Sequence, residues 1–139
     1  MRDQFSLAIY IFAIAFAGCS PPDPLDSLDS RSLPVVSGSE LESYVTKSEV
    51  PVLVEFGVDF QCERCRQMKT SIVDLADKYR GQADVIRVDF NANAALAAQL
   101  GGKICPTYVL FQDGKPIHTE NFPVSADILE SRLNTIERQ

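Results

Sequence analysis

The chain has 139 residues, of which 45% are hydrophobic and 23% are charged, and its formal net charge at pH 7 is −6. This length suffices for one domain with a hydrophobic core. The acidic balance and the lack of any run of lysine or arginine argue against nucleic acid as a partner, because phosphate binding needs a basic surface.

Residues 1–19 have the pattern of an export signal. The apolar run over 5–17 is interrupted only by Ser6 and Tyr10, and it is too short to span a bilayer comfortably. The small residues before Cys19 resemble the lipobox of bacterial lipoproteins, which implies that Cys19 is lipidated and becomes the new N-terminus. An ordinary signal peptide with an incidental Cys19 and an uncleaved anchor are the alternatives.

Residues 20–32 are rich in proline, serine and aspartate and cannot build a core. They are predicted to be a flexible tether to a folded domain over 33–139. We therefore expect an exported protein, anchored by lipid on the periplasmic side of the cell envelope. In familiar lipoproteins an Asp after the lipidated cysteine favours the inner membrane, so Ser20 at that position favours the outer membrane slightly.

Hydrophobic periodicity and turn residues predict alternating strands and helices in the domain. A capping box at 39–42 indicates a helix, and the apolar run over 50–56 indicates a buried strand. The Asp113-Gly114 pair indicates a hairpin turn. The predicted order is an edge strand over 34–36, a helix over 40–47, a strand over 50–56, a helix over 62–80, a strand over 85–90, a helix over 94–100, strands over 107–111 and 116–119, and a helix from 125.

Two cysteines stand where the strand over 50–56 gives way to the following helix. Cys62 and Cys65 are three positions apart, so both sulfurs lie on one side of the first helical turn, close enough to bond. Cys62 lies at the positive end of the helix dipole, which stabilises its thiolate. This pattern predicts a redox dithiol with Cys62 as the nucleophile and Cys65 as the resolving thiol. A stable structural disulfide, or an inert relic of one, is the alternative.

Four stretches together resemble the thioredoxin family over residues 33–139. They are Val52-Leu53-Val54-Glu55-Phe56, Cys62-Glu63-Arg64-Cys65, Cys105-Pro106-Thr107 and Leu110-Phe111-Gln112-Asp113-Gly114-Lys115. The resemblance implies an α/β thioredoxin fold, with a central mixed sheet of four to five strands and helices on both faces. It also implies a cis peptide bond before Pro106, beside the dithiol.

The resemblance suggests roles for two charged residues. Glu55 stands where the family keeps a buried acid, and a carboxyl in an apolar strand is costly to ionise, so it is expected to shuttle the proton of Cys65. The alternative is a glutamate that reaches water at the strand end. Arg64 is expected to stabilise the Cys62 thiolate, against the opposing charge of Glu63; a solvated surface charge is the alternative.

Cys105, Pro106 and Thr107 match the segment that guides the backbone of substrates in the family. Cys105 is a third thiol in a domain whose other two cysteines form a pair. Three interpretations remain open for it. It competes for Cys62 in a second disulfide, it completes a metal site with Cys62 and Cys65, or it is a small apolar filler.

The predicted function is a membrane-tethered thiol–disulfide oxidoreductase that acts on protein dithiols or disulfides. No organic cofactor is needed, and a monomer is expected. A copper- or zinc-binding module that uses Cys62, Cys65 and Cys105 is the first alternative. An interaction domain with idle cysteines is the second. His118, the only histidine, is expected to be a solvated strand residue rather than a ligand.

Overall fold

The computed structural model of the protein describes residues 31–136. The predicted signal, Cys19 and most of the predicted tether lie outside this range. Within it, no helix is long and apolar enough to cross a membrane. The elements in chain order are α2 (Gly38–Lys47), β1 (Val52–Gly57), α3 (Glu63–Lys78), β2 (Asp84–Asp89), α4 (Ala94–Gln99), β3 (Thr107–Gln112), β4 (Lys115–Asn121) and α5 (Ala126–Ile136).

In the described range the strands form one four-stranded sheet in the order β2-β1-β3-β4. β1 pairs with β2 in parallel and with β3 antiparallel, while β3 and β4 form the predicted antiparallel hairpin. β1 and β3 are therefore central. The segment after β1 leads to Cys62 and the segment before β3 contains Cys105, so the antiparallel pairing places both segments at the same end of the sheet.

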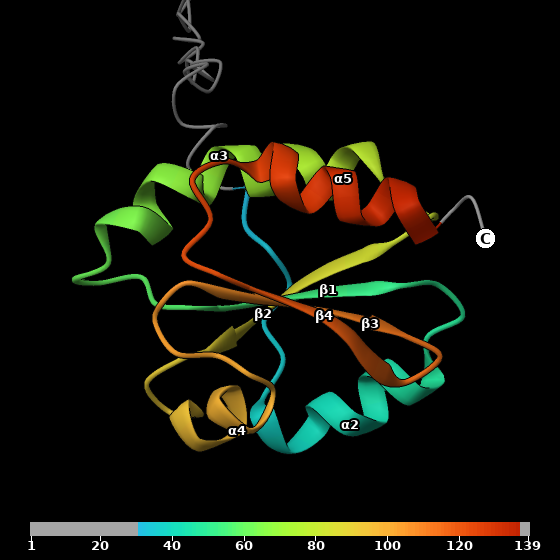
Figure 1. Cartoon of the computed structure of the whole chain (residues 1–139), viewed down its shortest axis with the longest axis horizontal. Coiled ribbons are helices and arrows are strands. Elements are labelled where there is room, and N and C mark those ends of the chain that lie inside the picture. The colour runs from blue at the N-terminus through green and yellow to red at the C-terminus, as the bar shows by residue number, and fades with distance from the viewer. Residues whose placement is uncertain (1–30, 137–139) are drawn as a thin grey trace, which may run out of the picture. The chain divides into compact units, whose positions relative to one another are not determined.

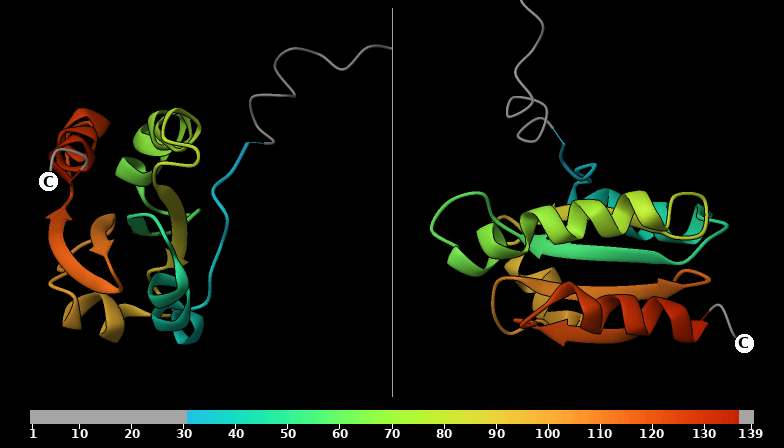
Figure 2. Two further views of the ribbon diagram at one scale, coloured as in Figure 1. Left: turned by 90° about the vertical axis from the view of Figure 1, so that its right-hand side faces the viewer. Right: turned by 90° about the horizontal axis from the view of Figure 1, so that it is seen from above.

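Helices cover both faces of the sheet, α3 and α5 on one and α2 and α4 on the other (Figures 1 and 2). Successive side chains along each strand point to opposite faces of the sheet, so they contribute to two hydrophobic clusters, one on each face. Leu53 of β1 packs in the cluster beneath α3 and α5 with Ile72 and Leu129. Val54 of the same strand packs on the other face with Leu41 of α2. All six residues of β1 are buried, as its apolar run predicts.

Two local predictions are corrected by the structure. Residues 34–36 do not form a strand; Val35 makes only an isolated parallel bridge to Arg87. α2 begins at Gly38, two residues before the predicted helix start at 40, with Ser37 as its N-cap. The Ser37 hydroxyl donates to the Glu40 carboxylate at 2.5 Å and makes no capping hydrogen bond to the backbone.

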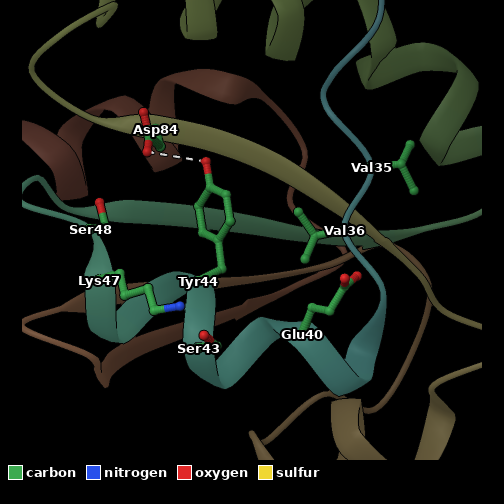
Figure 3. Close-up of a pocket in the computed structure, with 8 residues that line it drawn as sticks. All are labelled: Val35, Val36, Glu40, Ser43, Tyr44, Lys47, Ser48 and Asp84. Carbon is green, nitrogen blue, oxygen red and sulfur yellow. Dashed lines mark hydrogen bonds between the residues drawn. The ribbon is translucent and has the colours of Figure 1, made fainter.

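The Tyr44 side chain ties α2 to the edge of the sheet. Its hydroxyl donates a hydrogen bond to Asp84 at 3.2 Å, and burial followed by the charge of Asp84 raises the pKa of Tyr44. The two residues line a groove of about 540 Å³ together with Val35 and Val36 (Figure 3). Cys62, Cys65 and Cys105 do not line this groove, so it is separate from the predicted site.

Candidate active site

The CxxC pair is a closed disulfide at the N-terminus of α3. Cys62 is the N-cap residue, and its sulfur accepts a hydrogen bond from the backbone N–H of Cys65 at 3.0 Å. The Cys62–Cys65 bond is 2.04 Å long. Cys62 is half-buried and Cys65 is 3% exposed. Partners therefore reach Cys62 first, at the end of the helix where the dipole and the N–H group favour a thiolate.

The Cys105 thiol lies against this disulfide. Its sulfur is 3.3 Å from that of Cys65 and 3.6 Å from that of Cys62. The Cys105-Pro106 peptide bond is cis, as the resemblance implies. Burial raises the pKa of the Cys105 thiol, so at neutral pH it is the neutral S–H form. The three sulfurs all lie within 4.8 Å of one another.

Glu55 is fully buried and has two hydrogen-bond partners. One carboxylate oxygen accepts from Nε of Arg87 at 2.7 Å, and the other accepts from the Tyr108 hydroxyl at 2.9 Å. Burial, then the charge of Glu55, raises the pKa of Tyr108. The prediction that Glu55 is buried is confirmed, and the alternative, a glutamate that reaches water at the strand end, is wrong. The proton-shuttle role stays a prediction.

Arg64 contacts an aromatic ring. The guanidinium carbon lies 4.9 Å from the centroid of the Phe122 ring, a cation–π contact. Its Nε is buried and makes no hydrogen bond within the described residues. Glu63 is paired with Arg66 at 2.5 Å and accepts from Gln67; these hydrogen bonds lower the pKa of Glu63. The alternative of a freely solvated Arg64 does not hold, and its effect on Cys62 stays a prediction.

The loop before β3 is held from within. Thr107 is fully buried, and its hydroxyl donates to the Ile104 carbonyl at 2.6 Å. The carbonyl of Pro106 accepts a hydrogen bond from the N–H of Phe122 at 2.9 Å. Thr107 therefore shapes the segment instead of presenting its side chain to a partner. Among the three residues predicted to bind substrate, only Cys105 has a half-exposed side chain.

Several functional side chains were missed by the sequence reasoning. Phe60, two residues before Cys62, is 84% exposed, and Ile104, next to Cys105, is 47% exposed. Arg87 and Tyr108 are the partners of Glu55. A usable signal existed for Arg87, because it interrupts an apolar strand just as Glu55 does.

His118 is half-buried on β4 with Glu120 3.2 Å away, rather than fully solvated as expected, and it is not in the cysteine cluster.

A disulfide at a helix N-terminus, faced by a cis-proline loop and bordered by exposed apolar side chains, defines a thiol–disulfide exchange site. The family model for thioredoxin matches residues 32–135. The chain therefore belongs to the thioredoxin family and is a thiol–disulfide oxidoreductase with Cys62 and Cys65 as its CxxC pair.

Individual relatives agree with this assignment. The chain is 31% identical over 84 residues to thioredoxin 1 of Synechococcus elongatus, covering 60% of this chain and 78% of the relative. It is 28% identical over 103 residues to the thioredoxin of Porphyra purpurea, covering 74% and 95%. The structure of thioredoxin f2 from Chlamydomonas reinhardtii superposes with a TM-score of 0.67 at 22% identity, covering 77% of this chain and 98% of that one. The predicted thioredoxin fold is confirmed.

The exposure difference predicts the order of thiol modification. After reduction, brief treatment with iodoacetamide at neutral pH is expected to label Cys62 before Cys65, because Cys65 is buried and Cys62 is not. Peptide mass spectrometry measures the labelling of each cysteine over time. Preferential labelling of Cys65 would overturn the assignment of nucleophile and resolving thiol.

The Glu55–Arg87 pair predicts a large loss of stability when one partner is removed. Arg87→Met leaves a fully buried carboxyl without its cation, so the free energy of unfolding should fall by about 3 kcal/mol or more. Arg80→Met is the control, since Arg80 is 81% exposed in its pair with Asp77 and should cost about 0.5 kcal/mol at most. Urea denaturation of the oxidised protein measures both. Equal losses for the two variants would contradict a structural role for the buried pair.

Proposed function

We propose that this protein is an exported, membrane-tethered oxidoreductase that exchanges disulfides with protein partners. The observation that carries the proposal is the accessible Cys62, bonded to Cys65 at the start of α3, beside the Cys105-Pro106 loop. In the reducing direction, the Cys62 thiolate attacks a partner disulfide and forms a mixed disulfide. Cys65 then attacks the Cys62 sulfur, which releases the partner's thiolate and closes the Cys62–Cys65 bond. The oxidising direction is the reverse.

Exposed apolar side chains around the disulfide support a protein as the substrate. Phe60 and Ile104 lie close to Cys62 and Cys105 in the sequence. Phe122 is 40% exposed, and its ring contacts the Arg64 guanidinium. Exposed apolar residues grouped beside a reactive bond are typical of a docking surface for another protein. A small thiol or disulfide needs no such border.

Glu55 is proposed to accept the proton of Cys65 as that thiol attacks. Its support is the position of a fully buried carboxylate in β1, the strand that leads into the dithiol. Tyr108 and Arg87 hold both carboxylate oxygens in place. Arg64 is proposed to favour the Cys62 thiolate through its charge, at a position next to Cys65.

The proposed tether rests on the sequence of residues 1–32. Two features support lipid attachment in the cell envelope: an apolar segment precedes Cys19, and a segment too polar to form a hydrophobic core follows it. Ser20 favours the outer membrane in this proposal. The tether would keep the catalytic domain near the membrane without fixing its orientation.

A turnover assay with two substrates tests the oxidoreductase. Cys62→Ser is expected to abolish reduction of insulin disulfides. Phe60→Ser is expected to lower kcat/KM for insulin by about tenfold, the effect of roughly 1.4 kcal/mol of lost contact, and to leave the reaction with a small aromatic disulfide unchanged. Val35→Ser is the matched control, because Val35 is 72% exposed and lines the separate groove.

The outcomes of this assay separate the parts of the proposal. Residual insulin turnover by Cys62→Ser contradicts the role of Cys62. If Phe60→Ser and Val35→Ser behave alike toward insulin, or if Phe60→Ser slows both substrates equally, the border of the disulfide is not a protein-docking surface.

The tether is tested by removing the candidate lipidation site. Cys19→Ala is expected to abolish incorporation of radiolabelled fatty acid and to release an exported protein that no longer sediments with membranes. Membrane fractionation and intact mass measure this. A full-length Cys19→Ala protein that stays in the membrane identifies the apolar segment as an anchor and refutes the lipoprotein assignment.

A further inference from the structure

The reduced site holds three thiol groups that face one another, and the exchange reaction uses only two of them. Cys62 and Cys65 come from the start of α3, and Cys105 comes from the loop before β3. Within the described residues, this is the one group of three or more potential metal ligands whose donor atoms lie close together, within 4.8 Å. No carboxylate or imidazole of the described residues belongs to this group. The carboxylates of Glu55 and Asp59 are both paired with Arg87.

We propose that Cys62, Cys65 and Cys105 form a three-thiolate site for one copper(I) ion when the disulfide is reduced. Sulfur donors select soft ions such as copper(I) and zinc. Zinc in protein sites is almost always four-coordinate, and the cluster offers three ligands. The three cysteines leave zinc one ligand short of its usual four, so a water would have to supply the fourth, whereas copper(I) is satisfied by three thiolates; the site therefore fits copper(I) better than zinc.

Two of the three sulfur–sulfur distances are already close to those of a planar three-coordinate ion, and the third, the 2.04 Å Cys62–Cys65 bond, opens when the disulfide is reduced. Metal–sulfur bonds of about 2.3 Å, arranged at 120° to one another, place the sulfurs about 4.0 Å apart. The Cys105 sulfur is already 3.3 Å from that of Cys65 and 3.6 Å from that of Cys62. These distances need to grow by well under ~1 Å, which side-chain rotation supplies once the Cys62–Cys65 bond is broken.

The surroundings partly offset the negative charge of three thiolates. At Cys105, burial and the charge of Glu55 disfavour the thiolate, whereas a backbone hydrogen bond at Val58 and the charge of Arg87 favour it. At Cys62, the N–H of Cys65 and the N-terminus of the sixteen-residue helix α3 favour the anion. Arg64 adds a cation beside Cys65 in the chain. The ion itself replaces the three thiol protons, which are released on binding.

Oxidation state then controls the site. In the oxidised protein two of the three sulfurs are bonded to each other, so the three-thiolate site does not exist. A dithiol reductant transfers two electrons and two protons to the disulfide, which gives two thiols, and the reductant becomes a disulfide. Copper(I) then binds with loss of three protons. The bound ion occupies Cys62, so it also blocks disulfide exchange.

Copper(I) titration of the full-length chain tests the proposal. Every sample carries Cys19→Ser, so that only the three site thiols remain, and is kept in mild detergent under anaerobic conditions. After reduction and removal of the reductant, a thiol assay must count three thiols before any metal is added. A colourimetric copper(I) chelator then competes for the ion and reports stoichiometry and affinity, and X-ray absorption reports the number of sulfur neighbours.

The expected result is one copper(I) per reduced chain with three sulfur neighbours, and no binding by the oxidised chain. Cys105→Ser and Cys105→Ala should each weaken binding by more than the roughly 100-fold typical of losing a residue that only supports a metal ligand, and leave two sulfur neighbours. Both variants should keep the far-ultraviolet circular dichroism spectrum and the cooperative urea unfolding of the parent chain, which shows that they are folded.

This inference rests on the proposed function in one respect, because both require a Cys62–Cys65 disulfide that can be reduced. The experiment nevertheless distinguishes failure of the copper site from failure of the proposed function. A chain in which the thiol assay finds no reducible disulfide refutes both. Three free thiols with no copper(I) uptake, or equal affinity in the Cys105 variants, refute the copper site alone. Tighter Cys105-dependent binding of zinc than of copper(I), measured with a zinc indicator, also refutes it.

Discussion

A row of hydrogen bonds across the three adjacent strands β2, β1 and β3 fixes the sheet beneath the disulfide. Glu55 of β1 lies opposite Arg87 of β2 in one strand pair and opposite Tyr108 of β3 in the other. Both partners hydrogen-bond its carboxylate. A shift of either pair by one residue would turn these side chains to the opposite face and leave a buried charge unpaired, which opposes slippage strongly. Because β1 leads to Cys62 and β3 follows Cys105, the same row aligns the two segments that carry the sulfurs.

This alignment explains why three sulfurs converge while only two of them bond. Thiol–disulfide exchange requires a thiolate as the attacking group. Burial raises the pKa of Cys105, whereas Cys62 caps α3 and receives the N–H of Cys65. The Cys105 thiol therefore stays protonated beside the Cys62–Cys65 bond at neutral pH. It is close enough to interact with both sulfurs, yet it is a poor competitor for either.

The sequence predicted the elements with strong periodicity and missed those that depend on a partner. The buried run of β1, the helix after Cys62 and the hairpin at Asp113-Gly114 follow from local pattern. The segment 34–36 has strand-like composition, but only Val35 finds a bridge at the edge of the sheet. Glu55 was recognisable as a buried acid. Its pairing with Arg87 depends on the register of two strands separated in the chain, which no local pattern encodes.

The charged residues of the CxxC motif, Glu63 and Arg64, both have partners in the structure, and this changes their expected effect on a thiolate at Cys62. Glu63 opposes a thiolate at Cys62 in sequence, but its carboxylate is paired with Arg66 and Gln67, which directs its charge toward the solvent side of the helix. Arg64 favours the thiolate in sequence, but its guanidinium stacks on Phe122. The hydrogen bond to the Cys62 sulfur comes from the backbone N–H of Cys65, at the positive end of the α3 dipole. Because this group belongs to the backbone, the preference for a thiolate at Cys62 follows from the helix start itself, and the effect of Arg64 on Cys62 stays a prediction.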